Sequence, residues 1–235
     1  MLGQKRLQSL TCVALAPSPN AGQTPDSFML TGRLTLSDVN PVATGSRHSI
    51  YRHPTDRNLL IKVRRATAKP VWYKFHRRLY GPSIGFAREI REQLLIWSRC
   101  KCHPAFLSKI VGFCETDIGI GMVIERLNDA DGNLAKNLVT IIRSGDFDNE
   151  KKSDLDTFLS QLLSSPLYFD DLCAANIVYG FDKDAGRYRF VLVDGFGHKT
   201  LIPVARLLPA LDRRRQKHQI DRLYSDICRL GGCIG

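Results

Sequence analysis

Short runs of apolar residues, some alternating with polar residues, occupy much of the first half of the chain and predict β-strands. The runs with this extended pattern are residues 30–36, 49–51, 59–63, 106–113 and 121–125. Between the third and fourth runs, apolar residues recur at helical spacing from Phe86 to Trp97, which predicts one helix. The first half is therefore expected to form a sheet with a single helix.

Helical spacing is more frequent in the second half. It predicts helices over residues 134–143 and 155–163, the second preceded by the start signal Ser153-Asp154. A third amphipathic helix with a solvated basic face is expected further on, because its apolar residues also recur at helical spacing. These residues are Ile220, Leu223, Ile227 and Leu230.

Two strands interrupt this helical half. Residues 177–181 and 188–193 are rich in apolar, β-prone residues, and the segment 182–187 between them holds the Asp and Gly residues typical of a hairpin turn. Residues 1–28, by contrast, are rich in Pro, Ser, Gly and Gln and follow no period. We therefore expect a disordered tail there.

The composition is that of an ordinary globular protein. Of the 235 residues, 43% are hydrophobic and 24% are charged, which excludes collagen, coiled coils and disorder of the whole chain. No apolar run approaches the roughly 18 to 20 residues that would span a bilayer, so we expect no transmembrane segment. The seven cysteines are an odd number without framework spacing, which favours reduced thiols and a cytoplasmic location.

Three groups of polar residues, read together, indicate phosphoryl-transfer chemistry. Lys62 lies inside an apolar strand, Asp171 and Asn176 bracket a loop before the hairpin, and Asp194 follows the hairpin. Phosphoryl transfer uses a lysine on the donor phosphates, a carboxylate near the acceptor hydroxyl, and an amide with a second carboxylate to hold magnesium. Each residue also has a purely structural interpretation, because strand lysines can snorkel and Asp and Asn favour turns.

The spacing of these motifs resembles that of the protein-kinase-like fold. Its catalytic loop runs Asp-Leu-x-x-x-Asn, as from Asp171 to Asn176, and Asp194-Gly195-Phe196-Gly197 looks like a permuted Asp-Phe-Gly motif. Further short matches lie in residues 43–47, 51–54, 61–63, 88–90, 115–119, 129–132, 176–179 and 193–203. Through these matches the chain more closely resembles the YrbL family of bacterial PhoP-network regulatory proteins.

The resemblance implies a two-lobed α+β fold with ATP and Mg²⁺ as cofactors. A small antiparallel-sheet lobe would cover residues 29–127, and a reduced helical lobe would cover residues 128–235. Lys62 would contact the ATP phosphates and pair with Glu89, with Glu92 as the rival partner.

The remaining roles implied by the resemblance lie around the same cleft. Gly45 and Ser46 would cover the phosphates, Ile124 would be the gatekeeper, and the backbone from Glu125 to Leu127 would meet adenine. The site would be completed by three side chains of the second lobe. Asn176 and Asp194 would hold magnesium, and Asp171 would orient or deprotonate the acceptor.

The sequence departs from the kinase pattern at positions that matter for activity. Only Gly45 remains of the glycine-rich loop, Phe169 and Asp170 replace His-Arg, and Cys173 stands where protein kinases usually keep a lysine. Less positive charge near the transferred group implies a slow enzyme or none. The short segment after Gly197 leaves no room for a full peptide-docking platform, so a conventional peptide acceptor is not expected.

The net charge of +11 is unevenly placed. A basic block, residues 57–88, contains no Asp or Glu, and its lysines and arginines are interleaved with Trp72, Tyr73, Phe75 and Tyr80. We interpret it as a positively charged flap that attracts ATP or an anionic acceptor to a nearby cleft. A solvated loop without a partner is the alternative interpretation of this segment.

Three functional hypotheses follow from the sequence. The first is a kinase-like phosphotransferase that binds ATP and magnesium in a bacterial regulatory response and acts on an unidentified acceptor. The second is a pseudokinase, in which the nucleotide-shaped cleft serves as a switch or docking surface without catalysis. The third is a basic protein that binds nucleic acid or anionic lipid, which only the clustered charges support.

Overall fold

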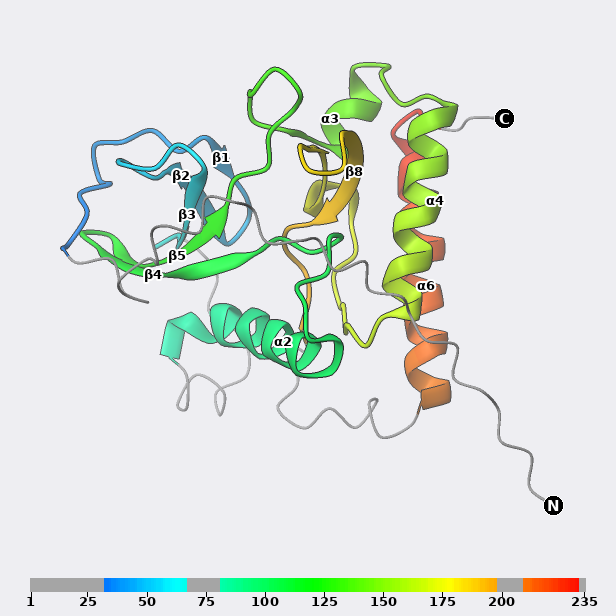
Figure 1. The fold of residues 1–235 in the computed structure, drawn as a ribbon, viewed down its shortest axis with the longest axis horizontal. Coiled ribbons are helices and arrows are strands. Elements are labelled where there is room, and N and C mark those ends of the chain that lie inside the picture. Colours follow the sequence, from blue (N-terminus) through cyan, green and yellow to red (C-terminus); the bar gives the residue numbers. More distant parts are fainter. Residues whose placement is uncertain (1–31, 67–80, 198–208, 233–235) are drawn as a thin grey trace.

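The computed structural model describes residues 32–66, 81–197 and 209–232 and shows a mixed α+β architecture (Figure 1). Two antiparallel sheets and four α-helices make up most of the described chain. The tail predicted for residues 1–28 lies outside the described residues. So does the aromatic part of the basic block, within residues 67–80.

The larger sheet is formed by the first half of the chain and has the strand order β1-β2-β3-β5-β4. In chain order, its strands are β1 (Ala43–Thr44), β2 (His48–Arg52), β3 (Leu59–Arg64), β4 (Ile110–Thr116) and β5 (Gly119–Glu125). Alternation along β3 sends Ile61 and Val63 into a cluster on one face, whereas Leu60 and Lys62 belong to the opposite face. Lys62 is thus a charged residue within a nearly fully buried strand.

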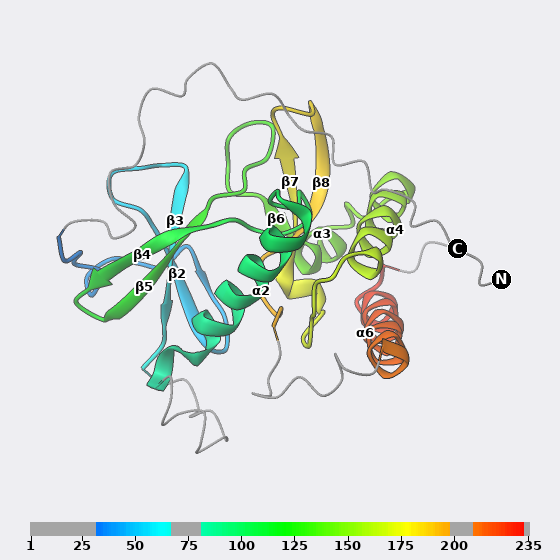
Figure 2. The ribbon, with the colours of Figure 1, turned by 60° about the horizontal axis from the view of Figure 1, so that its bottom comes forward.

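Helix α2 (Ile84–Cys100) follows the short 3₁₀ helix η1 (Gly81–Ser83) and lies across the face of the sheet that carries Lys62 (Figure 2). Phe86 packs against Leu60, Met122 and Ile124 of the sheet. The buried side of α2 also carries two carboxylates, Glu89 and Glu92. Buried carboxylates require polar partners, so α2 brings acidic groups into the interior beside β3.

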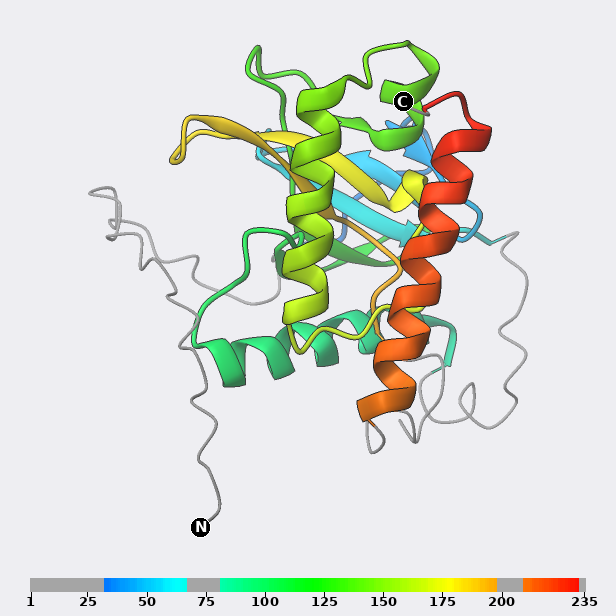
Figure 3. The ribbon, with the colours of Figure 1, turned by 90° about the vertical axis from the view of Figure 1, so that its right-hand side faces the viewer.

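In its described part, the second half of the chain forms a three-stranded sheet and three α-helices. Its elements are β6 (Lys136–Asn137), α3 (Leu138–Arg143), α4 (Asn149–Ser164), η2 (Ala174–Asn176), β7 (Ile177–Asp182), β8 (Arg187–Leu192) and α6 (Pro209–Arg229). Helix α4 packs against β8, and α6 lies beside α4 and contacts η2 (Figure 3). Their apolar faces meet in the largest core cluster, which includes Leu155, Phe158 and Leu223.

The two halves are joined through the segment after α2. Leu107 forms a parallel bridge with Leu192 at the end of β8, and the Ser108 N–H donates to the Leu192 carbonyl at 3.0 Å. Ile96 of α2 and Leu107 are buried in the same core cluster as α4 and α6. This connection fixes the end of β8 close to the buried face of α2.

Several predicted elements differ from those observed. The predicted strand 30–36 is only an isolated bridge at Leu34 within its described part, and the predicted strand 106–113 begins at Ile110 as β4. The predicted helix 134–143 is helical only from Leu138, because Lys136 and Asn137 pair with β7 as β6. Helix α4 begins before the predicted Ser153-Asp154 signal, at Asn149.

Side-chain caps explain where these helices start. The Asp148 carboxylate accepts the Lys151 N–H at 2.8 Å and begins α4, and the Asn137 side chain accepts the Thr140 N–H at 2.9 Å and begins α3. The first turn of α4 is polar. The helix therefore starts before its apolar period becomes visible.

Among the helices in the described parts of the chain, none is both long enough and apolar enough to cross a membrane. Described cysteines with free thiols are Cys100, Cys102, Cys114 and Cys173. Cys228 in α6 is instead disulfide-bonded, so the expectation of reduced thiols is wrong for this residue. The predicted solvated basic face of α6 is observed, with Ile220, Leu223 and Ile227 buried beneath it.

Candidate functional site

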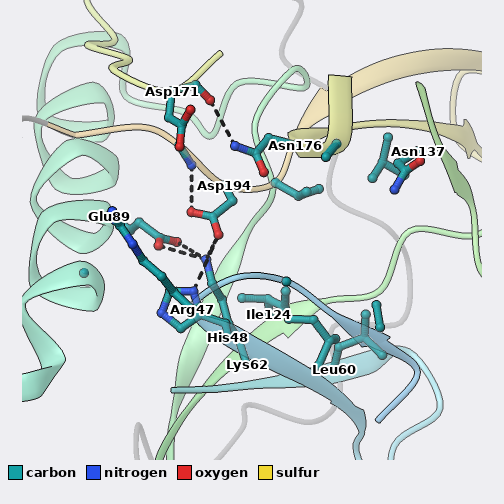
Figure 4. A pocket seen from close by; sticks show the side chains of 18 of the residues that line it. Arg47, His48, Leu60, Lys62, Glu89, Ile124, Asn137, Asp171, Asn176 and Asp194 are labelled. Atoms are coloured by element: carbon teal, nitrogen blue, oxygen red, sulfur yellow. Dashed lines mark hydrogen bonds and ion pairs between the residues drawn. The ribbon is translucent and has the colours of Figure 1, made fainter. Parts of the chain in front are cut away.

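A cavity of about 590 Å³ lies where the two halves of the molecule meet (Figure 4). Its walls come from the β1–β2 turn, β2, β3 and α2 on one side, and from the loop before η2 and the segment after β8 on the other. The residues that the sequence analysis assigned to the cleft line it: Gly45, Ser46, Lys62, Glu89, Ile124, Glu125, Leu127, Asp171, Asn176 and Asp194. Glu92, the rival partner of Lys62, does not.

Lys62 is the centre of a buried ionic cluster. Its Nζ lies 2.8 Å from Glu89 Oε1, 3.1 Å from Glu89 Oε2 and 3.1 Å from Asp194 Oδ2. The Lys62 side chain is 2% exposed and that of Glu89 is 5% exposed, whereas that of Asp194 is 36% exposed. The ammonium therefore joins a buried acid on α2 to an acid that faces the open cavity.

The electrostatics of this cluster follow from burial and close contact. Burial alone would lower the pKa of Lys62, but Glu89 and Asp194 outweigh burial and raise it above the ordinary value. Burial raises the pKa of Glu89 to about 7, although Lys62 opposes the shift. Burial also disfavours the charge on Asp194, but Lys62 and His48 hold the pKa of Asp194 well below its ordinary value.

Glu92 takes a separate structural role. It is fully buried one turn along α2 from Glu89, and its Oε2 accepts the Tyr168 N–H at 3.4 Å. Its other oxygen lies 3.4 Å from Arg91 Nη2. Glu92 thus attaches α2 to the segment that leads to Asp171, while Glu89 alone of the two pairs with Lys62.

The loop containing Asp171 and the segment containing Asp194 are held against each other by main-chain hydrogen bonds. The Asp170 and Asp171 N–H groups donate to the Gly195 carbonyl at 3.0 and 3.1 Å, and the Asn176 amide nitrogen donates to the Asp171 carbonyl at 2.9 Å. Gly195 has φ +84°, and a Cβ there would collide with the Asp171 main chain and the Asn176 amide. Only glycine allows this close approach.

Two side-chain oxygens in this part of the cavity are of the type that binds magnesium. Because Asn176 uses its nitrogen on Asp171, its oxygen is left as an acceptor, beside the Asp194 carboxylate (Figure 4). Magnesium is usually bound by one or two protein oxygens together with substrate phosphates. No cluster of three or more His, Cys, Asp or Glu suited to a metal occurs in the described parts of the chain.

Part of the cavity wall is apolar. Leu60, Ile124 and Leu134 belong to one apolar cluster and line the cavity together with Leu127, which follows β5. An apolar slot that ends in a cluster of charges is the usual form of a site for a ligand with a flat organic group and a charged group.

Sequence reasoning missed three groups on the charged side of the cavity: Arg47, His48 and Arg88. His48 Nδ1 lies 3.6 Å from Asp194 Oδ2, and its ring stacks on Phe86. Burial lowers the pKa of His48, although Asp194 opposes this, so burial favours the neutral imidazole.

The pairing of β2 with β3 explains why His48 lies on the same side of the sheet as Lys62. Lys62 of β3 pairs with Ile50 of β2, so their two side chains lie on the same face of the sheet. His48 lies two residues before Ile50 on β2, and residues two apart on a strand share a face. His48 is therefore on the Lys62 face once the β2–β3 register is known.

Comparison with known proteins identifies one family. No curated protein matches the chain. The family model described as "PhoP regulatory network protein YrbL" matches residues 34–228, which include every residue of the cavity named above. The match covers most of the sequence, and the chain therefore belongs to the PhoP regulatory network protein YrbL family.

Proposed function

We propose that this chain is a kinase-like protein that binds ATP with Mg²⁺ in the cavity and transfers the γ-phosphoryl group to a non-peptide acceptor. One observation carries the proposal. The Lys62 ammonium contacts both Glu89 and Asp194, from elements more than a hundred residues apart, within a cavity that also holds Asp171 and Asn176. Phosphoryl transfer uses these groups for positioning and charge stabilisation.

The two ends of the cavity match the two ends of ATP. The apolar slot of Leu60, Ile124, Leu127 and Leu134 suits adenine, beside the backbone from Glu125 to Leu127. Gly45 and Ser46, in the turn between β1 and β2, line the cavity on the side that would cover the phosphates. In this interpretation the sheet half and the helical half are the two lobes of a kinase-like fold.

Asp194 and Asn176 would hold the magnesium ion through their side-chain oxygens. When bound, the ion would neutralise charge on the phosphates as the phosphoryl group leaves. Lys62 is already held by Glu89, which fixes its position before the nucleotide enters. A preorganised cation of this kind requires no rearrangement during the reaction.

Asp171 would act on the acceptor. The acceptor oxygen attacks the γ-phosphorus, the bond from that phosphorus to the β–γ bridging oxygen breaks, and ADP leaves. The acceptor hydroxyl proton passes to Asp171 and then to solvent. The hydrogen bonds from the Asp170 and Asp171 main chain to Gly195 keep this loop beside Asp194.

A non-catalytic nucleotide-binding module is the second candidate, and Cys173 favours it. Burial raises the pKa of the Cys173 thiol and Asp171 raises it further, so the side chain is neutral. Position 173 therefore supplies no positive charge next to Asp171. A site with that charge missing could bind ATP without transferring phosphate and so act as a regulatory switch.

The proposal is tested by measuring ATP affinity and ADP production on the same samples. Wild type should bind ATP in the presence of magnesium and release ADP in the presence of an acceptor or water. The Asp171→Asn variant should bind ATP as wild type does and lose ADP production. Equal turnover in the variant would remove Asp171 from its role, ATP binding without any wild-type turnover would favour the second candidate, and no ATP binding would refute both.

A further inference from the structure

Two arginines face the cavity without an ion-pair partner. Arg47 and Arg88 both line it, and within the described residues neither forms a salt bridge. Other cavity cations are engaged, because Lys62 pairs with two acids and Lys136 lies 3.3 Å from Asp146. Arg47 and Arg88 therefore bring positive charge into the cavity that no acidic side chain neutralises.

The acidic groups near these arginines already form ion pairs with other cations. Glu89 and Asp194 contact Lys62, and Asp170 Oδ1 lies 2.5 Å from Arg215 Nη2 of α6. Arg88 itself makes one hydrogen bond within its helix, from Nε to the Ile84 carbonyl at 3.3 Å. Most of the donors of its guanidinium are thus left for another group.

The two arginines lie at the charged end of the cavity. Arg88 precedes Glu89 on α2, and Gly197 passes so close that a Cβ there would meet the Arg88 backbone and Cβ at 3.0 Å. Arg47 lies in the β1–β2 turn and is drawn beside Glu89 and Lys62 in Figure 4. They therefore approach the Asp194–Gly197 segment from the sheet half of the molecule.

The positive charge of each arginine disfavours the positive charge of the other. Burial lowers the pKa of Arg88, and the nearby charge of Arg47 lowers it further, although Glu89 and Asp170 oppose the shift. Arginine remains charged at any physiological pH. Two cations on the wall of one cavity, neither of them in an ion pair, are stabilised when an anionic ligand binds there.

We propose that Arg88 and Arg47 bind the terminal phosphate of ATP. They would supply, from the sheet half of the molecule, the positive charge that the neutral Cys173 does not supply. Guanidinium groups suit this task, because their planar array of donors matches phosphate oxygens. This inference rests on the proposed function. It adds that two named arginines bind the phosphoryl group that is transferred.

The test compares the affinities of Mg-ATP and Mg-ADP by isothermal titration calorimetry, because the two ligands differ only in the terminal phosphate. Variants Arg88→Ala and Arg47→Ala are measured beside Arg99→Ala, which removes the same charge from the exposed last turn of α2. A charge-assisted hydrogen bond is worth about 1.5–3 kcal/mol. We therefore expect the preference for ATP over ADP to fall about tenfold or more in Arg88→Ala.

The ADP affinity of each variant serves as the check on folding and on the rest of the site. We expect it to stay within about twofold of wild type, with Arg88→Lys intermediate in its ATP preference and Arg99→Ala unchanged. Arg47 is exposed, so Arg47→Ala tests the same proposal where Arg88→Ala fails to fold. A loss of ATP preference in either variant supports the proposal.

Other outcomes overturn it. An unchanged ratio of ATP to ADP affinity in Arg88→Ala and Arg47→Ala, with wild type binding both nucleotides, would refute the phosphate contact and leave the proposed function standing. This is also the result expected if the arginines instead bind an anionic acceptor. Wild type that binds neither nucleotide would refute the proposed function, and this inference with it.

Discussion

Replacing Lys62 by methionine tests the buried ionic cluster most severely. Methionine keeps most of the volume of the lysine stem but removes the ammonium that contacts Glu89 and Asp194 at 2.8–3.1 Å. Glu89 is then left with its side chain 5% exposed and without its cation. Breaking a buried ion pair by removing one partner costs about 3–5 kcal/mol.

The two carboxylates do not contribute equally to that loss. Asp194 is 36% exposed and can be hydrated when Lys62 is absent, whereas Glu89 cannot. Most of the destabilisation should therefore come from Glu89. In urea unfolding at pH 8, we expect Lys62→Met to lose about 3 kcal/mol or more of the free energy of unfolding.

Acidification should reduce this loss. The pKa of Glu89 is already raised to about 7, and removing Lys62 raises it further. An acid whose pKa is raised by folding adds stability below its unfolded value of 4.5 and loses that stability as pH rises through the folded value. The difference between Lys62→Met and wild type should therefore be largest at pH 8 and smaller at pH 5.

A second substitution provides the control. In Lys62→Met with Glu89→Gln the buried charge is gone, so the double variant should be more stable than Lys62→Met alone at pH 8. The reasoning is refuted if Lys62→Met unfolds within 1 kcal/mol of wild type at pH 8, or if the two substitutions are additive.

Three further results are expected. Gly195→Ala should lose about 2 kcal/mol or more in urea unfolding, because its Cβ would collide with the Asp171 main chain at φ +84°; wild-type stability would contradict this. Arg215→Ala should lower stability by about 1 kcal/mol or more by removing the Asp170 contact, with Arg215→Lys closer to wild type; equal losses in both would contradict it. Burial lowers the pKa of His48 from 6.5, so its contribution to stability declines as pH falls below 6.5; His48→Gln should flatten that decline in unfolding curves, and an unchanged pH profile would count against it.

Several residues that line the cavity could be picked out from the sequence because they stand out locally. Lys62 is a charge inside an apolar strand, and Asp171, Asn176 and Asp194 flank a hairpin that the alternating pattern identifies. The structure brings all four to the walls of one cavity. Their roles toward ATP and magnesium stay predictions.

Other parts of the site depend on long-range packing that the sequence pattern does not encode. Glu89 and Glu92 are both buried on α2, and only the rotation of α2 against the sheet brings Glu89, and not Glu92, to Lys62. Arg47 received no role from the sequence, and Arg88 was interpreted only as the last residue of the basic block, residues 57–88. Their position in the cavity follows from the β1–β2 turn and from the contact between α2 and Gly197.

The errors in the elements have similar causes. Strand β6 has two residues and exists only because β7 pairs with it from forty residues away. Its residues were therefore included in a helix that starts at Leu138. The start of α4 was missed because its first turn is polar and its signal is the single cap Asp148.

The central claim is that Asp194 and a magnesium-bound nucleotide meet in this cavity. Isothermal titration of ATP, with magnesium and with EDTA, on wild type and on Asp194→Asn measures this directly. The account predicts that magnesium strengthens ATP binding to wild type at least tenfold and that Asp194→Asn loses most of this enhancement. Equal enhancement in the variant, or no ATP binding by wild type, would contradict it.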